Sequence, residues 1–353
     1  MNISIGIVGL PNVGKSTLFN ALLKRQIAEA ANYPFCTIEP NVGVVEVPDH
    51  RLQVLYDMVK DRDTKIIPAV VKFVDIAGLV KGAASGEGLG NQFLSHIREC
   101  QMILEVVRDF SDENVIRAGA ENPESDMATI KTELILKDLE TVTKLSNNKQ
   151  QKTVNKLDLV RGSAADKLLT GLNQGLAASE VILSEEEMVE AKNWQLLTMK
   201  PIVYVLNVDE SRTHLDASLQ VVSLSISAKM ESELSALSDL EQKEYLAGLG
   251  LSESGLDRVI KICFHTLGLQ TFLTAGPKEV RAWTIRQGAK GPEAAGAIHG
   301  DFERGFISAE VCHYDDYIAV GGWSKAKELG KVRLEGREYV MKEGDIVEFR
   351  FSV

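Results

Sequence analysis

The sequence predicts an α/β core, a helical insertion within that core, and a small α+β domain at the carboxyl end. A glycine-rich motif at residues 9–17 lies between a short apolar strand pattern and a helical pattern. Helical periodicity continues through most of residues 128–199, and the composition becomes strand-rich after Gly276-Pro277. The expected boundaries are residues 1–127 and 200–275 for the core, 128–199 for the insertion and 276–353 for the last domain.

The core is predicted from the motif G-x-x-x-x-G-K-S, which begins at Gly9. A strand, a glycine-rich turn and a helix in this order form a P-loop, whose backbone N–H groups surround phosphate oxygens. We expect Lys15 to contact the β- and γ-phosphates and the Ser16 hydroxyl to coordinate Mg²⁺. A chance glycine-rich turn is the alternative, and the presence of both side chains weighs against it. The predicted nucleotide contacts in this motif are Asn12, Val13, Gly14, Lys15, Ser16 and Thr17.

Two later segments are candidates for the rest of a metal site. Residues 32–41 contain two prolines and little periodicity, and in P-loop GTPases a threonine in such a loop adds a second hydroxyl to Mg²⁺. Thr37 is the candidate, and a plain surface turn is the alternative. The strand pattern at residues 69–75 ends in a D-x-x-G motif, in which we expect Asp75 to hold the metal through a water and the Gly78 N–H to approach the γ-phosphate.

Leu79 occupies the place at which Ras-like enzymes carry a glutamine that orients the attacking water. A leucine cannot donate or accept a hydrogen bond, so the chemistry must use a group from elsewhere or remain slow. The glycine-rich residues 81–91 follow, and we expect them to be a switch that the γ-phosphate orders. A flexible linker is the alternative.

The helical insertion is predicted to be a hairpin, in the manner of a short coiled coil, and its charges are unevenly distributed. A solvated face is the ordinary explanation of such a pattern, and a basic arm for RNA phosphates is the sharper hypothesis. The charged residues concerned are Lys144, Lys149, Lys152, Lys156, Arg161 and Lys167, followed by Glu180, Glu185, Glu186, Glu187 and Glu190.

The base-binding segment is predicted at Asn207, where another buried strand pattern ends. GTPases carry N-K-x-D at this place, whereas this chain has Val208 in place of the lysine and Glu210 in place of the guanine-reading aspartate. Asn207 and the backbone of Val208 remain candidates for contact with the purine. Ser227-Ala228-Lys229 matches the S-A-K loop that cradles the base.

Overall composition limits the classes of function. The 353 residues are 44% hydrophobic and 25% charged, which is typical of globular proteins, and the formal net charge is −11. This charge disfavours wholesale coating of nucleic acid but not a local basic patch, and we expect no DNA partner. The four widely spaced cysteines indicate a reducing compartment, and no apolar run approaches transmembrane length. The chain opens in a strand pattern rather than a secretion signal, so we expect a cytoplasmic protein.

Taken together, these motifs resemble those of the YchF proteins, the Obg-like ATPases of the translation-factor-related P-loop class. The resemblance covers essentially the whole chain, because the carboxyl-terminal segments are similar to a TGS domain, a ubiquitin-like β-grasp module. The segments that carry the resemblance are residues 9–17, 34–41, 75–94 and 207–210 in the core and residues 278–285, 301–307 and 339–353 in the last domain.

The resemblance implies a preference for ATP over GTP, dependence on Mg²⁺, and binding to the ribosome, with the large subunit and RNA as expected partners. It also implies that the hydrophobic Leu79 is normal for the class. Asn12 matches an asparagine that helps to hold K⁺ in related enzymes, so K⁺ is a candidate second cofactor.

The chain departs from the family pattern at two places. Family members commonly read H-V-V-R-C-F where this chain has E-V-V-R-D-F at residues 105–110, and many carry a histidine where this chain has Arg117. Slow unassisted hydrolysis is therefore expected. An arginine acting in cis on the transition state is one role for Arg117, and a solvent-exposed side chain without a catalytic role is the alternative.

Three functions follow from these observations as competing hypotheses. The first is an ATPase switch that acts on the translation machinery. The second is a GTPase of the Obg type, which the P-loop context alone would favour. The third is a ribosome- or RNA-binding module in which hydrolysis is incidental. The relative affinities for ATP and GTP separate the first two, and the nucleotide dependence of ribosome binding separates the third.

Overall fold

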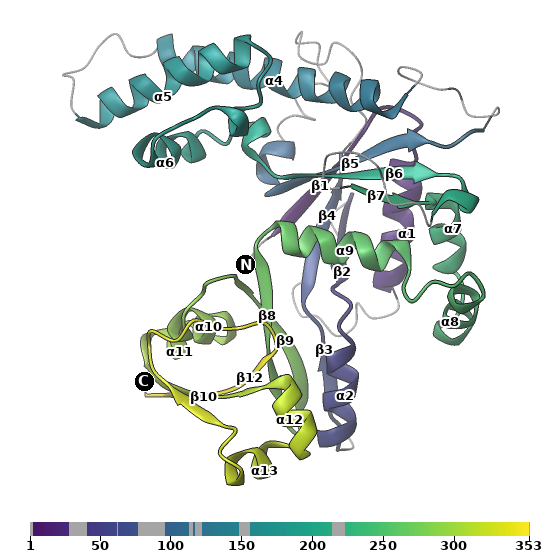
Figure 1. Cartoon of the computed structure of the whole chain (residues 1–353), viewed down its shortest axis with the longest axis vertical. Coiled ribbons are helices and arrows are strands. Elements are labelled where there is room, and N and C mark those ends of the chain that lie inside the picture. The colour runs from purple at the N-terminus through teal and green to yellow at the C-terminus, as the bar shows by residue number, and fades with distance from the viewer. Residues whose placement is uncertain are drawn as a thin grey trace.

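The computed structural model of the chain is an α/β P-loop core with a helical arm and a carboxyl-terminal α+β domain (Figure 1). The residues that it describes are 3–27, 41–61, 63–76, 96–112, 116, 122–147, 156–213 and 223–352.

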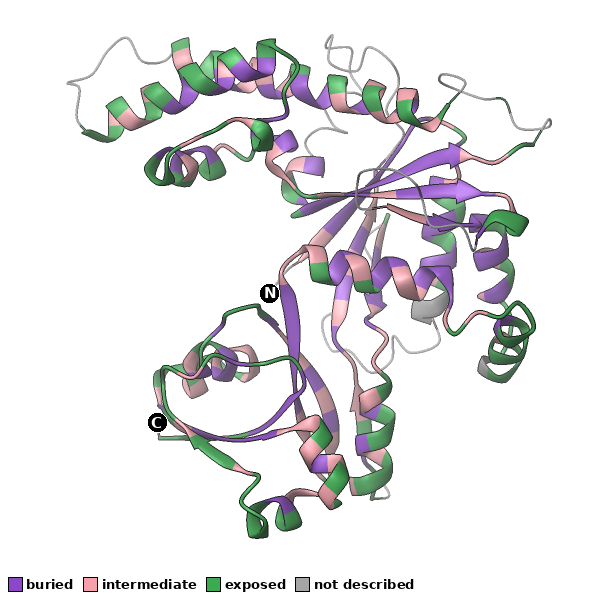
Figure 2. Cartoon of the chain, viewed as in Figure 1, coloured by how far each residue is buried: buried purple, intermediate pink, exposed green. Residues whose placement is uncertain are grey.

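The core is built on a six-stranded sheet in which every neighbouring pair is parallel except β2 and β4. Its central strands are apolar and buried, because helices cover both faces of a parallel sheet (Figure 2). In sheet order the strands are β2 (Val42–Glu46), β4 (Val70–Asp75), β1 (Ser4–Val8), β5 (Met102–Asp109), β6 (Ile202–Val208) and β7 (Ser223–Ile226).

Helices α1 and α9 pack their apolar sides into the large core cluster, while the start of α4 contacts the other face of β5 and β6. The parallel arrangement directs the carboxyl ends of β1, β5, β6 and β7 toward one edge, where ligands of such sheets bind. The helices of the core are α1 (Lys15–Ile27), α7 (Ala228–Leu234), α8 (Asp239–Gly248) and α9 (Gly255–Thr266).

The insertion between β5 and β6 is helical and has its own apolar cluster (Figure 1). Its first helix begins at Pro123, earlier than the predicted start of the insertion at residue 128. Proline is well suited to the first position of a helix, where its missing N–H is not needed, and Asn122 accepts a hydrogen bond from the Ser125 N–H. The helices are α4 (Pro123–Asn147), α5 (Lys156–Asn173) and α6 (Glu185–Asn193).

The second sheet is mixed and also contains six strands, in the order β11-β10-β12-β8-β9-β3. Short helices flank it, and Phe272 and Phe306 lie in its apolar cluster. The strands are β11 (Arg333–Glu335), β10 (Phe306–His313), β12 (Asp345–Phe351), β8 (Leu269–Ala275), β9 (Glu279–Arg286) and β3 (Lys65–Ile67), and the helices are α10 (Gly291–Ile298), α11 (Gly300–Arg304), α12 (Tyr314–Val320) and α13 (Trp323–Glu328).

The second sheet includes two segments that the sequence analysis assigned to the core. Strand β8 pairs with β9, so the expected boundary at residue 276 falls inside a hairpin. Strand β3 pairs in parallel with β9, and the adjacent helix α2 (His50–Val59) is tied to the same sheet. Arg51 of α2 donates to Thr271 Oγ1 (3.0 Å) and pairs with Glu343 (2.5 Å). These contacts join residues more than 200 positions apart, which local patterns cannot indicate.

Within the part of the chain that the structure describes, no helix combines the length and the apolar character needed to cross a membrane.

Candidate nucleotide site

The P-loop follows β1 and passes close to two neighbouring strands. Gly9 and Gly14 adopt positive φ angles of 155° and 102°, and Asn12 lies in the left-handed region at 61°. A Cβ atom at Gly9 would lie 2.4 Å from the Val106 carbonyl oxygen, and one at Gly14 would lie 2.3 Å from Asn207 Nδ2. Both glycines are therefore required by close approach as well as by backbone conformation.

Lys15, the first residue of α1, is 8% exposed and folds back over the loop. Its ammonium group donates to the Leu10 carbonyl oxygen at 2.7 Å. Burial lowers the pKa of Lys15, and the nearby Asp75 carboxylate opposes that shift. The Lys15 ammonium is thus bonded to a neutral backbone oxygen near a carboxylate. A charged phosphate oxygen would form a stronger hydrogen bond with it than the carbonyl oxygen does.

Asp75, the last residue of β4, lies next to the start of the same helix. Its carboxylate accepts a hydrogen bond from Ser16. Burial raises the pKa of Asp75, while Lys15 and Ser16 oppose the shift. A hydroxyl and a carboxylate side by side are hard oxygen donors of the type that Mg²⁺ prefers, so these two residues fit the predicted metal site.

A cavity of about 940 Å³ opens at the carboxyl ends of the parallel strands. It brings together the P-loop, the segment after β6 and the S-A-K loop, which are far apart in sequence. The predicted residues that line it are Asn12, Gly14, Ser16, Thr17, Asn207, Val208, Glu210, Ser227, Ala228 and Lys229.

Asn207, which lines the cavity, also bridges two of these loops. Its Nδ2 donates to the Val13 carbonyl oxygen, and its Oδ1 accepts from the Ala228 N–H, both at 2.9 Å. The side chain is only 6% exposed. The described bonds of Asn207 position the P-loop against the S-A-K loop, and because Asn207 also lines the cavity, its expected contact with a purine edge stays a prediction.

The remaining base-site candidates divide into buried and exposed groups. Val208 points into an apolar cluster with Val107 and Leu206, so only its backbone is suitable for ligand contact. The Ser227 hydroxyl accepts from the Met230 N–H and caps α7. At the rim of the cavity Lys229 and Glu210 form an ion pair of 3.2 Å, and the hydrogen bond that Lys229 donates to the Glu210 carboxylate raises the pKa of Lys229.

The sequence analysis missed the loop after β5, which forms another wall of the cavity. Phe110, Ser111 and Asp112 line it together with Asp209. The sequence pattern could have indicated this loop, because it follows a buried strand. The carboxyl end of that strand lies at the same sheet edge as Asn207. Three predicted participants, Thr37, Gly78 and Arg117, and also Leu79, lie outside the described residues.

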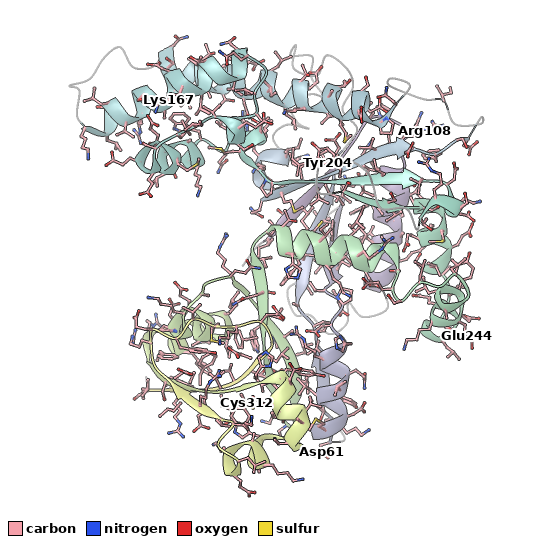
Figure 3. All side chains as sticks on the ribbon, viewed as in Figure 1. Asp61, Arg108, Lys167, Tyr204, Glu244 and Cys312 are labelled. Atoms are coloured by element: carbon pink, nitrogen blue, oxygen red, sulfur yellow. The ribbon has the colours of Figure 1, made fainter. Side chains whose placement is uncertain are left out.

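Three of the basic residues singled out in the helical arm pair with glutamates of the arm, while Lys149 and Lys152 lie outside the described residues. Three glutamates of α6 pair with three cations of α5, among them Lys167, which Figure 3 labels, and the two helices also share the apolar cluster. The ion pairs offset the charge of three of these cations, so the solvated face that the sequence analysis gave as the ordinary explanation accounts for them, and the RNA-binding arm stays a hypothesis. The pairs are Lys156 with Glu186 (3.0 Å), Arg161 with Glu190 (2.7 Å) and Lys167 with Glu187 (2.7 Å).

Comparisons with known proteins agree with this geometry. Residues 4–156 match a family model described as 50S ribosome-binding GTPase, and residues 269–352 match the YchF-GTPase_C model, described as a protein of unknown function. The chain is similar to the ribosome-binding ATPases YchF of Bacillus subtilis (48% identical over 374 residues) and Haemophilus influenzae (47% over 366 residues), with all of each chain covered. It is also similar to the solved structure of the Schizosaccharomyces pombe YchF GTPase, at a TM-score of 0.86 and 34% identity over 99% of this chain and 98% of that one.

Proposed function

The chain belongs to the YchF family of P-loop NTPases, and from that premise we propose that it is a ribosome-associated ATPase. It binds ATP in the cavity at the sheet edge and hydrolyses it to ADP and phosphate as a nucleotide-dependent switch. The observation that carries the proposal is the single cavity shared by the P-loop and the Asn207–Glu210 segment. Its two ends suit the triphosphate and the purine of one ligand.

The phosphate end is assigned to the P-loop backbone N–H groups and to Lys15. Without ligand Lys15 donates to the Leu10 carbonyl oxygen near the Asp75 carboxylate, and with ligand it neutralises phosphate charge. Ser16, Thr37 and, through a water, Asp75 are the proposed Mg²⁺ ligands, and Asn12 is the proposed contact for K⁺. When bound, Mg²⁺ offsets the negative charge of the phosphate oxygens. We assign to the Gly78 N–H the recognition of the γ-phosphate.

ATP is favoured over GTP because Glu210 stands where GTPases carry the aspartate that reads guanine. The ion pair with Lys229 further occupies its carboxylate. Comparing the dissociation constants of the two nucleotides with Mg²⁺ tests this assignment. GTP binding at least about tenfold more tightly than ATP would favour the GTPase alternative.

Hydrolysis without a partner is expected to be slow, between about 4 × 10⁻⁴ per second, the intrinsic rate of Ras, and about a hundredfold faster, because the Leu79 side chain cannot orient water. A single-turnover assay with ATP, Mg²⁺ and K⁺ measures this rate. If Arg117 acts in cis, Arg117→Ala slows the chemical step at least tenfold with ATP affinity nearly unchanged. An unchanged rate assigns the missing group to the ribosome or to an ordered water.

Association with the ribosome, with the large subunit and RNA as the proposed contacts, is inferred from the relatives, whose names state ribosome binding. A cytoplasmic location follows from that assignment. Co-sedimentation with ribosomes in the absence of nucleotide, with ADP and with a non-hydrolysable ATP analogue tests the switch. Equal binding in all three states would support the module with incidental hydrolysis.

A further inference from the structure

A buried glutamate of α7 lies one helical turn beyond the S-A-K loop. Glu231 is 1% exposed, although a glutamate is rarely buried unless its charge has partners. Its side chain reaches the start of α9, to which the chain returns from α7 through α8 (Figure 1). Glu231 is not among the residues that line the cavity, so any effect on a ligand must pass through the elements that it joins.

The Glu231 carboxylate completes the amino-terminal cap of α9. Its Oε1 accepts from the Gly255 N–H at 2.7 Å, and its Oε2 accepts from the Leu256 N–H at 3.2 Å. The hydroxyl of Ser254, the N-cap residue, accepts from the Asp257 N–H at 3.0 Å. The first N–H groups of a helix have no acceptor within the helix, so Glu231 provides the acceptors for two that the bond to Ser254 does not cover. Its negative charge also suits the positive end of the helix dipole.

Gly255 allows α9 to approach the junction between β7 and α7 closely. A Cβ atom at Gly255 would lie 2.7 Å from Glu231 Oε1 and 2.8 Å from Cγ2 of Ile226, the residue directly before the S-A-K loop. Arg258 of α9 adds another bond at this place, because its Nη2 donates to the Ser225 carbonyl oxygen at 3.1 Å. Since the apolar side of α9 packs in the large core cluster, the helix is a firm support for this junction.

The first turn of α7 connects Glu231 to the S-A-K loop. The Glu231 N–H donates to the Ser227 carbonyl oxygen at 3.0 Å, and the Ser227 hydroxyl accepts from the Met230 N–H. On the other side of the loop, the Ala228 N–H donates to Asn207 Oδ1. The loop is therefore held by Asn207 on one side and, through α7, by Glu231 on the other.

We propose that Glu231 is a positioning residue that fixes the S-A-K loop at the base end of the cavity by binding the amino end of α9. The inference rests on the proposed function, in which this loop cradles the purine while the P-loop holds the phosphates. Substitution of Glu231 should weaken recognition of the base selectively, because the contacts of the P-loop with phosphate do not pass through α7. A purely structural role would instead affect all ligands equally.

The test compares ATP with inorganic tripolyphosphate, which retains the phosphates and lacks the base. Binding of each to the full chain with Mg²⁺ is measured for the wild type, Glu231→Gln and Gly255→Ala. Glutamine replaces one acceptor oxygen by an amide donor, and the alanine methyl group displaces the carboxylate. We expect ATP affinity to fall about fivefold or more in both variants, while tripolyphosphate affinity stays within about twofold of the wild type.

Two substitutions in α8 are the matched controls. Glu241→Gln changes a glutamate that accepts from the Ser238 N–H in the cap of α8, and Gly248→Ala adds a Cβ atom that meets nothing within 4 Å. Both should keep the wild-type ratio of ATP to tripolyphosphate affinity. Equal losses of the two ligands, or unchanged ATP affinity, in either Glu231→Gln or Gly255→Ala would overturn the inference. Retained tripolyphosphate binding shows that a variant is folded, and a wild type that binds tripolyphosphate but not ATP would instead refute the proposed function.

Discussion

The nucleotide site and the helical arm both contain buried charged groups, but these groups have different kinds of hydrogen-bond partner. In the arm, Glu187 and Glu190 are 7% and 9% exposed and are paired with Lys167 and Arg161. In the P-loop beside the cavity, Lys15 is similarly buried yet donates to a backbone carbonyl oxygen. Cations that the arm neutralises internally act in packing, whereas Lys15 remains available for an anionic ligand.

This difference explains why charge counting along the chain is a poor guide to binding. The arm has more basic residues than the P-loop, but those on α5 face the glutamates of α6. Although Glu187 and Glu190 are buried, their cations are about half exposed, so each pair contributes little free energy, and its main effect is to set how the helices dock. Four substitutions, from the largest expected effect to the smallest, test the comparison.

Lys15→Ala should weaken ATP binding about 100-fold, or about 2.7 kcal/mol, because it removes a charged donor to the phosphates. Isothermal titration measures the change. Lys167→Ala in the arm is the control, and ATP affinity should then stay within about twofold. Equal losses of ATP affinity in the two variants would contradict the distinction between Lys15 as a ligand-binding cation and Lys167 as an internally paired one.

Asn207→Ala should destabilise the core by about 1–3 kcal/mol, because it leaves the Val13 carbonyl and the Ala228 N–H without their partner. ATP affinity should also fall, because the P-loop and the S-A-K loop lose the side chain that connects them. Asn173→Ala serves for comparison, since that exposed arm residue bonds only the Leu169 carbonyl of its own helix. Thermal unfolding and ATP titration of both variants decide whether Asn207 is a bridge.

Glu210→Asp should raise the affinity for GTP relative to ATP by about three- to tenfold, because the shorter carboxylate restores the guanine-reading group. It is a cleaner change than one that also introduces lysine at Val208, which is buried among apolar side chains. Glu253→Asp, at a glutamate between α8 and α9 that pairs with Lys261 and does not line the cavity, should leave the ratio unchanged. Competition between labelled ATP and GTP gives the ratio directly.

Glu187 links arm stability to pH. Hydrogen bonds from Lys167, Ser163 and the Ser184 N–H lower its pKa to about 2 from an ordinary value of 4.5. The resulting stabilisation is complete above pH 4.5 and is lost as the pH falls from there toward 2. At pH 6 the backbone amides of the arm should therefore exchange hydrogen more slowly in the wild type than in Glu187→Gln. Near pH 2 the two proteins should exchange at the same rate, and ATP affinity should be the same in both. A difference that persists in acid would rule out this linkage.

The sequence by itself identified the features that adjacent residues define. Gly9, Gly14, Lys15 and Ser16 specify a phosphate-binding turn within eight positions, and Asp75 ends a strand that is visibly apolar. The order of strands and helices then implied the α/β core and the helical arm. These features depend on backbone geometry and hydrophobic periodicity, both of which are local properties of the chain.

Only the tertiary structure decided which distant groups meet. It placed β3 and β8 in the second sheet, paired the cations of α5 with α6, turned Asn207 into a bridge and joined the Glu231 carboxylate to the start of α9. Each of these outcomes depends on contacts between segments whose register and packing are set by the whole core. A charged or amide side chain bonds whichever partner the fold brings within about 3 Å, and the linear order of residues does not reveal that partner.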